Sequence, residues 1–315
     1  MALLTDFIAQ WHSDSPYIAA HTSGSTGKPK DICLLKSDMR LSARATNAFF
    51  GIGSESVLAS PLSFDYIAGK MMAVRAIEAA CSLLELPVSN EIEIPADVSR
   101  IDLLPVVPSQ IDSLLRQPEH ARRISAVLIG GAAPSAEQCR RLNNAGYNAY
   151  ISYGMTETCS HVALARADDP GRTFRAMPGI SFETDADGRL AVIAPAFSFG
   201  RLQTNDIVEL KDSTSFRWRG RADGVINSGG IKLFPEELEA LYSSVLGNRP
   251  FYVCATPHPQ WGQAAMLIIE GEADTEEISA ALRTAIADHR RLPKVIKTVH
   301  TLPRTSNGKI RRIPL

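Results

Sequence analysis

Apolar and polar residues change their spacing along the chain, and each kind of spacing predicts a different structure. Residues 123–131 form an apolar run that ends in two glycines, which is typical of a buried strand. The pattern predicts a helix from Ser135 through about Asn144, which Gly146 ends, and a second strand over residues 147–154. A strand, a helix and a strand in so short a stretch form a βαβ unit, which requires a parallel sheet.

The part of the chain that follows has short apolar runs separated by turn residues. These runs lie at residues 190–195, 205–210 and 215–220. Because they are short and closely spaced, they predict antiparallel strands rather than further βαβ units.

From about residue 221 the pattern is that of a small α+β domain. Pro235 opens one helix, and Asp274 precedes a second helix with the start of a capping box. The residues that share the apolar faces are Leu238, Leu241, Tyr242 and Val245 in the first helix, and Ile278, Ala281, Leu282, Ala285 and Ile286 in the second. The expected strands are residues 251–256, 264–270 and 295–300.

The fold class predicted from these elements is α/β in two domains. Residues 1–220 form a larger N-terminal domain with a parallel βαβ sheet plus antiparallel strands, and residues 221–315 form the small α+β domain. Apolar residues make up 45% of the 315, enough for two buried cores.

Charge and composition exclude several kinds of function. The 33 Lys and Arg residues against 34 Asp and Glu residues leave a net charge of −1, which argues against binding nucleic acid or an acidic membrane through bulk charge. No window approaches the run of about 20 apolar residues that a spanning helix needs, so we expect no membrane insertion. The five widely spaced cysteines indicate reduced thiols, and we expect a cytoplasmic protein.

Residues 21–30, with the sequence HTSGSTGKPK, carry the sharpest chemical signal. Gly24 and Gly27 free the backbone to direct its N–H groups toward one point, which hydroxyls and two lysines surround. Such a loop is suited to phosphate oxygens. It is not a Walker A loop, because only two residues separate the glycines and Pro29 follows Lys28. A flexible surface loop is the alternative.

A second group of candidate residues follows the strand at 147–154. Thr156 and Glu157 lie at the expected carboxyl end of that strand, where α/β sheets bind ligands. Glu157 could hold Mg²⁺ through oxygen, although a carboxylate in a loop is usually only solvated. Asp206 could accept hydrogen bonds from sugar hydroxyls, and its alternative is a turn residue ahead of a strand.

With these residues the chain resembles the adenylate-forming superfamily of acyl-CoA ligases, luciferases and adenylation domains of peptide synthetases. Six segments match the motifs of that superfamily in its order. They are Thr22–Lys30 (phosphate loop), Gly130–Pro134 (adenine pocket), Tyr153–Glu157 (the Y-G-x-T-E motif), Asp206 (ribose), Arg219–Asp223 continuing into Ile226–Lys232 (hinge), and Pro303–Ile310 (catalytic lysine).

The chain departs from the superfamily at three places. About 20 residues precede the phosphate loop, where the superfamily has a large α/β segment, so we expect a shortened fold with a smaller acyl pocket. Asp31 and Asn205 each stand where the superfamily usually has glycine.

The resemblance implies two steps: a carboxylate attacks the α-phosphorus of ATP to give acyl-AMP and pyrophosphate, and the thiol of CoA then displaces AMP. Lys309 would bridge the carboxylate and the α-phosphate, Thr156 would contact the α-phosphate, and Glu157 would hold Mg²⁺. The remaining implied contacts are phosphate at Thr22, Ser23, Gly24, Ser25, Thr26, Gly27 and Lys30; adenine at Gly131, Ala132, Ala133, Tyr153 and Gly154; ribose at Asp206 and Arg221; and the hinge and CoA tunnel of a mobile C-terminal domain at Asp223, Gly229, Gly230 and Lys232.

Lys309 stands in a basic tail, where a lysine is normally just solvated. The Asn307-Gly308 pair before it favours a tight bend that would present its side chain.

The acyl pocket is expected around Ser63, Phe64, Tyr66 and Lys70, with the aromatic rings as walls and Lys70 as partner of a second carboxylate. The alternative is a helix whose methionines, 71 and 72, are core residues, and for the methionines we favour it. The whole is most similar to short bacterial o-succinylbenzoate–CoA ligases of menaquinone synthesis.

Two other functions stay open. The chain could adenylate another aryl or fatty acid or load a carrier protein, or it could bind nucleotides without catalysis. The expected ligands are a small carboxylic acid, ATP, Mg²⁺ and CoA, with no nucleic-acid partner, and the expected state is a monomer or homodimer.

Overall fold

The computed structural model describes residues 3–21, 31–247, 249–304 and 310–313. The chain divides into two compact units, which we describe separately. The first contains Met1–Glu183, Ala191–Leu202 and Leu210–Arg217, and the second contains Thr184–Leu190, Gln203–Glu209 and Trp218–Leu315.

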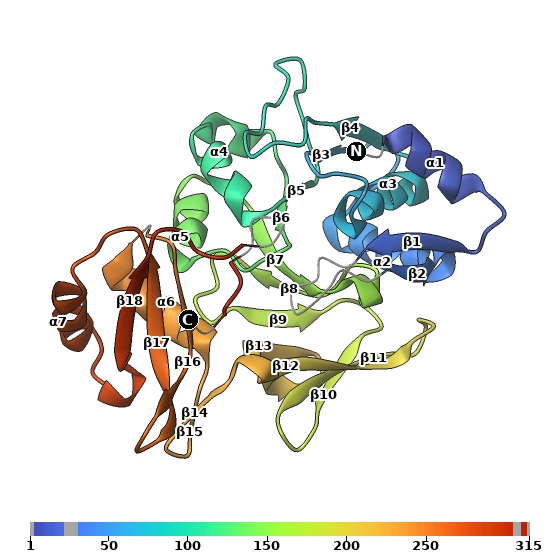
Figure 1. Cartoon of the computed structure of the whole chain (residues 1–315). Coiled ribbons are helices and arrows are strands. Elements are labelled where there is room, and N and C mark those ends of the chain that lie inside the picture. Colours follow the sequence, from blue (N-terminus) through green and yellow to red (C-terminus); the bar gives the residue numbers. More distant parts are fainter. Residues whose placement is uncertain (1–2, 22–30, 248, 305–309, 314–315) are drawn as a thin grey trace. The chain divides into compact units, whose positions relative to one another are not determined.

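The main sheet has nine strands in the order β10-β11-β12-β13-β9-β8-β7-β6-β5 (Figure 1). Their bounds are β5 (Leu104–Val106), β6 (Val127–Ile129), β7 (Ala149–Gly154), β8 (His161–Arg166), β9 (Thr173–Ala176), β10 (Ser181–Thr184), β11 (Arg189–Ala194), β12 (Gly200–Asp212) and β13 (Ser215–Arg221). β5, β6 and β7 are parallel, whereas β8 and β9 run antiparallel to their neighbours. This mixed sheet confirms the predicted α/β class.

The predicted βαβ unit is confirmed as β6, α5 (Ala136–Asn144) and β7. Ser135 caps α5 because its hydroxyl accepts a hydrogen bond from the Gln138 N–H at 3.0 Å. The capping residue therefore gave the helix start correctly, and Gly146 follows the helix with a φ of +82°.

The first unit also contains elements that the apolar pattern did not reveal. They are α1 (Leu4–His12), β1 (Tyr17–His21), β2 (Asp31–Leu35), α2 (Lys36–Phe50), β3 (Val57–Ser60), α3 (Ile67–Ala79), β4 (Ser82–Glu85) and α4 (Ile111–Leu115), with 3₁₀ turns at Pro108–Gln110, Pro118–Arg122 and Thr156–Thr158. Helix α3 is buried along Gly69–Ala76. Met71 and Met72 are fully buried there, which confirms them as core residues.

The second unit has a sheet in the order β15-β14-β17-β16, with β18 paired to β17 (Figure 1). Its elements are β14 (Ile226–Ser228), β15 (Ile231–Leu233), α6 (Pro235–Leu246), β16 (Phe251–His258), β17 (Gly262–Glu270), α7 (Thr275–Ala285) and β18 (Val295–Val299), with 3₁₀ turns at Ala222–Gly224 and His289–Arg291. Leu238, Tyr242 and Leu282 join sheet residues in one core, so the helix periodicity identified these faces correctly.

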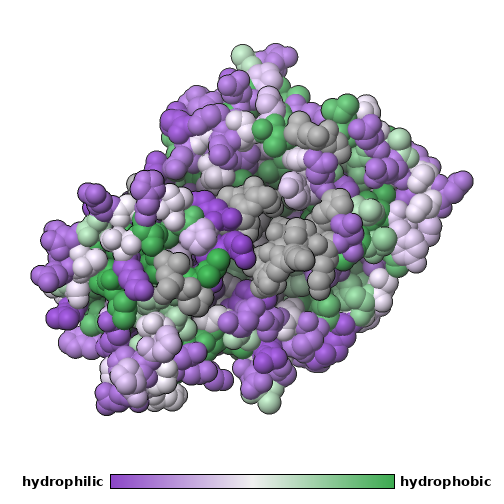
Figure 2. Space-filling model, in the orientation of Figure 1, coloured by the Kyte–Doolittle hydropathy of each residue, from purple (hydrophilic) through white to green (hydrophobic). Residues whose placement is uncertain are grey.

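The surface and the thiols agree with the composition. Figure 2 shows mostly hydrophilic side chains over the visible face. All five cysteines are free; Cys33 is exposed, while burial raises the pKa of Cys159 to about 12 and that of Cys254 to about 11. Among the helices the structure describes, none is both long and apolar enough to cross a bilayer.

Gly69 sets how closely α3 approaches the turn that precedes it. A Cβ atom at Gly69 would overlap the carbonyl oxygen of Ser63. The helix can therefore lie against residues 61–66 only because position 69 has no side chain.

We expect Gly69→Ala to lower the free energy of unfolding by about 3 kcal/mol, because backbone atoms must move to admit the methyl group. Gly53→Ala is the matched control, since a Cβ there meets no atom within 4 Å. Urea unfolding of both variants measures the difference. Equal stability of the two variants would show that the Gly69 contact relaxes at no cost.

Candidate functional site

Two of the predicted segments meet at the carboxyl edge of β6 and β7. Because these strands are parallel neighbours, the residues that follow them lie side by side. The Ser152 hydroxyl donates to the carbonyl oxygen of Ile129 at 2.9 Å and fixes the two strand ends to each other. The structure thus brings the predicted adenine segment, residues 131–133, together with the Tyr153–Glu157 motif.

The adenine segment presents exposed backbone. Gly131, Ala132 and Ala133 are exposed, and Gly131 has a φ of +79°, which favours glycine. The Gly130 N–H donates to the Val106 carbonyl oxygen at 2.9 Å, so β5 holds the start of this turn.

The Tyr153 ring packs against two phenylalanine rings. This half-buried ring packs edge-on against Phe216, with the ring centroids 5.0 Å apart, and lies 5.7 Å from Phe174. The register with β8 shifts between Tyr153 and Gly154. A Cβ at Gly154 would overlap the carbonyl oxygen of Ser160, so only glycine fits this bend.

Thr156 and Glu157 lie on the 3₁₀ turn Thr156–Thr158. Thr158 is buried, and its hydroxyl stabilises the turn because it accepts a hydrogen bond from the Met155 N–H at 3.0 Å. Glu157 is exposed and Thr156 half-buried. The turn therefore presents one carboxylate and one hydroxyl beside Tyr153.

A Mg²⁺ ion bound mainly by phosphates fits this donor set. Within the described residues, no group of three or more His, Cys, Asp or Glu side chains is arranged to hold a metal. Mg²⁺ commonly binds one or two carboxylates together with substrate phosphates and water, so a single exposed Glu157 suits it better than a closed protein cage would.

The residue that sequence reasoning missed is Arg75. It lies on α3 with 2% of its surface exposed, and burial lowers its pKa to about 10. One guanidinium nitrogen donates to the Ser160 hydroxyl at 2.7 Å and another contacts the Met72 sulfur at 3.3 Å. Its Nε has no hydrogen-bond partner, and it makes no ion pair among the described residues.

The neighbours of Arg75 do not neutralise it. His161 lies beside it, and both burial and the charge of Arg75 hold the pKa of His161 well below its usual value, so its imidazole stays neutral. The ring bonds Thr46 at 3.2 Å. Arg75 is thus a desolvated cation behind the Tyr153–Thr158 turn, in an environment suited to an anion. In the sequence Arg75 is a single charged residue within an apolar run, and no motif marks it as a binding residue.

The residues expected around the acyl pocket are placed differently from the prediction. Phe64 is 5% exposed and belongs to the core cluster with Phe7 and Trp11, so its ring is a core ring rather than an open wall. Lys70, 7% exposed, donates to the carbonyl oxygen of Ala19 at 2.6 Å. Burial lowers its pKa, and Asp65 partly opposes this.

The other two residues of this group are more open. Tyr66 is exposed, and the Ser63 hydroxyl bonds Asp65 at 2.9 Å. The Lys70 ammonium is bonded to strand β1, and Arg75 is a second candidate partner for a second carboxylate.

The ribose and hinge residues lie in the second unit. Asp206 is buried within β12 rather than at a turn and accepts from the Trp218 indole at 3.1 Å. Arg221 forms an ion pair with Asp223 at 3.1 Å.

The predicted CoA loop is the tip of the β14–β15 hairpin. Gly229 and Gly230 have φ values of +57° and +84°, as a tight two-residue turn requires. Lys232 is exposed beside them on β15.

Part of the predicted site lies outside the described residues. This concerns the phosphate-loop residues Thr22, Ser23, Gly24, Ser25, Thr26, Gly27 and Lys30, and the catalytic candidate Lys309. Strands β1 and β2, which flank the phosphate loop, pair from Tyr17–Leu35 to His21–Asp31.

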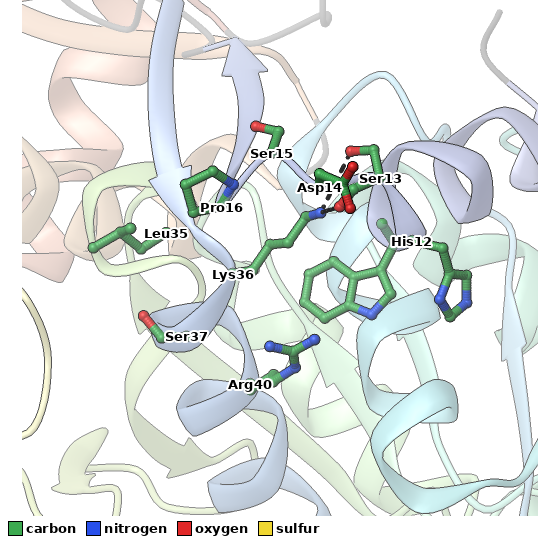
Figure 3. A pocket seen from close by; sticks show the side chains of 10 residues that line it. His12, Ser13, Asp14, Ser15, Pro16, Leu35, Lys36, Ser37 and Arg40 are labelled. Atoms are coloured by element: carbon green, nitrogen blue, oxygen red, sulfur yellow. Dashed lines mark hydrogen bonds between the residues drawn. The ribbon is translucent and has the colours of Figure 1, made fainter.

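A pocket of about 410 Å³ lies at the far end of that hairpin (Figure 3). It contains none of the predicted site residues. Its Lys36 ammonium donates to the Ser13 carbonyl oxygen at 2.7 Å, and its Arg40 lies over the Trp11 ring and 3.3 Å from Glu78. Since both cations are already engaged, we assign the pocket no ligand.

Comparison with known families identifies the chain. The model of the AMP-binding enzyme family matches residues 5–187, and that of the AMP-binding enzyme C-terminal domain matches residues 237–309. The chain belongs to the AMP-binding enzyme family. The first match covers more than half of the chain and includes the adenine segment and the Tyr153–Glu157 motif.

Several relatives of this AMP-binding enzyme are curated as 2-succinylbenzoate–CoA ligases. That of Enterococcus faecalis is 26% identical over 338 aligned residues, which cover 96% of this chain and 70% of the relative. That of Staphylococcus aureus is also 26% identical, and the alignment covers 92% of this chain and 65% of the relative.

Solved structures support the same fold. An acyl-CoA synthetase (AMP-forming)/AMP-acid ligase II-like protein from Dyadobacter fermentans is 31% identical with a TM-score of 0.64, and the match covers 97% of this chain and 90% of that chain. The O-succinylbenzoate coenzyme A synthetase of Bacillus subtilis, solved with ATP and magnesium, has a TM-score of 0.79 at 20% identity, covering 93% of this chain and 68% of that one. The second likeness is evidence for the fold.

Because Arg75 is desolvated without a carboxylate partner, we expect Arg75→Met to raise the free energy of unfolding by about 1 kcal/mol, or the melting temperature by about 2 °C. Arg44→Met on α2 is the control, since Arg44 is exposed and pairs with Glu78 at the surface. Thermal unfolding followed by circular dichroism compares them. A destabilised Arg75→Met protein would mean that the guanidinium supports the fold.

Proposed function

We propose that the chain is an ATP-dependent acid–CoA ligase that acts on 2-succinylbenzoate through an acyl-AMP intermediate. The reaction class is supported by the family and by alignments with 2-succinylbenzoate–CoA ligases over more than nine-tenths of the chain. Adenylation of a carboxylate and transfer to a thiol depend mainly on positioning and on neutralising charge.

The observation that carries the choice of acid is the uncompensated charge of Arg75. 2-Succinylbenzoate has two carboxylates: one reacts, and the other needs a cation. Arg75 is buried, bonded to Ser160 and without an ion pair in the described chain, so a carboxylate would balance it. A fatty acid or a simple benzoate would leave this charge unbalanced.

The nucleotide residues take the following roles. Tyr153 stacks on adenine beside the Gly131–Ala133 backbone, Thr156 donates to an α-phosphate oxygen, and Glu157 holds Mg²⁺, which neutralises phosphate charge. Lys309 stabilises the charge between the carboxylate and the α-phosphate. The remaining contacts are the phosphate-loop residues with phosphate, Asp206 and Arg221 with ribose, and Gly229, Gly230 and Lys232 with pantetheine.

Two further features belong to the proposal. The chain acts as two domains, with the smaller one beginning near residue 221 and turning about Asp223 between the two half-reactions. The protein is cytoplasmic and acts as a monomer or homodimer.

The direct test is AMP formation from ATP, Mg²⁺ and CoA with a panel of acids. We expect AMP release that requires both 2-succinylbenzoate and CoA. Lys309→Ala should abolish adenylation yet retain thioester formation from pre-made acyl-AMP, because only the first step develops charge between carboxylate and phosphate. Pyrophosphate exchange with an acid, but no AMP release when CoA is added, would favour a carrier-protein acceptor, and no pyrophosphate exchange with any acid would favour a nucleotide binder.

Arg75→Met should also change acid selectivity. We expect kcat/KM for 2-succinylbenzoate to fall about 100-fold, because a buried carboxylate loses its charged partner. Benzoate and 3-benzoylpropionate, which each keep one of the two carboxylates, should change by less than about threefold. Steady-state kinetics with the three acids makes the comparison, and a uniform loss on all of them would rule out a role for Arg75 in binding the second carboxylate.

A further inference from the structure

Asp206 and Trp218 form a hydrogen bond within the second unit. Trp218 belongs to none of the nucleotide motifs. Asp206 lies on β12, and Trp218 lies on the neighbouring strand β13. The indole N–H donates to Asp206 Oδ1 at 3.1 Å. An indole N–H is a donor only, so it holds Asp206 Oδ1 in place by donating to it.

The backbone of Asp206 is held independently of that bond. The Asp206 N–H donates to the Thr204 hydroxyl at 3.1 Å, and this hydroxyl donates to the carbonyl oxygen of Leu190 at 2.8 Å. Thr204, Asp206 and Val208 are buried on one face of β12. Because the strand is held in place, the hydrogen bond from Trp218 acts on the torsion angles of the Asp206 side chain.

The charged groups near Asp206 show why a neutral donor suits this place. Burial raises the pKa of Glu236, and the negative charge of Asp206 raises it further, whereas the positive charge of Arg312 lowers it. Arg312 is bonded to Glu239 at 2.6 Å and to Glu236 at 3.3 Å. The indole orients Asp206 without adding a charge to this cluster.

We propose that Trp218 is a positioning residue that sets how strongly the enzyme selects a ribose with free hydroxyls. The inference rests on the proposed function, in which Asp206 binds the ribose. A carboxylate accepts from two adjacent hydroxyls only when its plane faces both of them, because hydrogen bonds weaken steeply as their geometry departs from linear. Trp218 fixes that plane through Oδ1, so the loss of its N–H reduces discrimination at the sugar.

The test compares ATP with 2′,3′-dideoxy-ATP in the pyrophosphate-exchange assay. Trp218→Phe keeps an aromatic ring and removes the donor. We expect the ratio of kcat/KM for ATP to that for dideoxy-ATP to fall about tenfold, as for the loss of a hydrogen bond to a charged group. Loss of packing alone would lower both values and leave their ratio unchanged.

Trp261→Phe is the matched control. Trp261 lies in the same unit, where its ring stacks on His258 with the centroids 4.2 Å apart, whereas the indole bonded to Asp206 is that of Trp218. The ratio should stay at the wild-type value in this variant. An equal fall in both tryptophan variants would overturn the inference.

Asp206→Asn separates this inference from the proposed function. If Asp206→Asn collapses the ratio and Trp218→Phe leaves it unchanged, the ribose assignment stands and the role of Trp218 is refuted. If Asp206→Asn leaves the ratio unchanged, Asp206 does not read the ribose and both are refuted. In the Asp206→Asn background, Trp218→Phe should produce no further change.

A measurement on the wild-type protein does not depend on the folding of Trp218→Phe. The chain has three tryptophans, so its ¹⁵N spectrum should show three indole signals, and Trp11→Phe and Trp261→Phe assign two of them. We expect the third signal to shift with AMP and to shift much less with 2′,3′-dideoxy-AMP. Equal shifts with the two nucleotides would contradict a link between Trp218 and the ribose.

Discussion

The desolvated charge of Arg75 is the constraint that the rest of the first unit has to accommodate, and its guanidinium is held by a hydrogen bond to the Ser160 hydroxyl. This hydrogen bond joins α3 to the chain just after the Tyr153–Thr158 turn. The same arginine is tied to α2, because Asn47 donates to its carbonyl oxygen at 2.9 Å. Two helices and the turn are thus organised around one desolvated charge, whose cost the surrounding core must offset.

The second constraint is close contact between main-chain segments, and it acts on the same elements. Gly69 lets α3 approach the 61–66 turn, and Gly154 lets the strand bend over Ser160. A side chain at either position would overlap main-chain atoms. Glycines as well as the arginine therefore determine how these elements pack.

The parts of the fold that could be predicted from the sequence are those in which local chemistry and burial agree. Ser135 and Asp274 begin helices because their side chains cap them, and α7 shows a clean periodic face. Helix α3 could be offered only as an alternative, because its middle, Gly69–Ala76, is buried and this removes the apolar–polar alternation. Arg75 was missed for the same reason: its isolation results from tertiary packing. The Gly229-Gly230 pair did carry a hairpin signal, although it was interpreted only as a binding loop.

The contrast between the exposed Cys33 and the buried thiols has a practical consequence for following the enzyme in solution. A thiolate is the species that maleimides attack, and burial keeps Cys139, Cys159 and Cys254 protonated and inaccessible. Brief labelling at neutral pH therefore favours Cys33, which pairs with Ala19 across the β1–β2 hairpin. A dye attached there stands two residues from the end of β2, and the half-buried Cys81, whose pKa burial also raises, is the cysteine to replace for labelling at a single position.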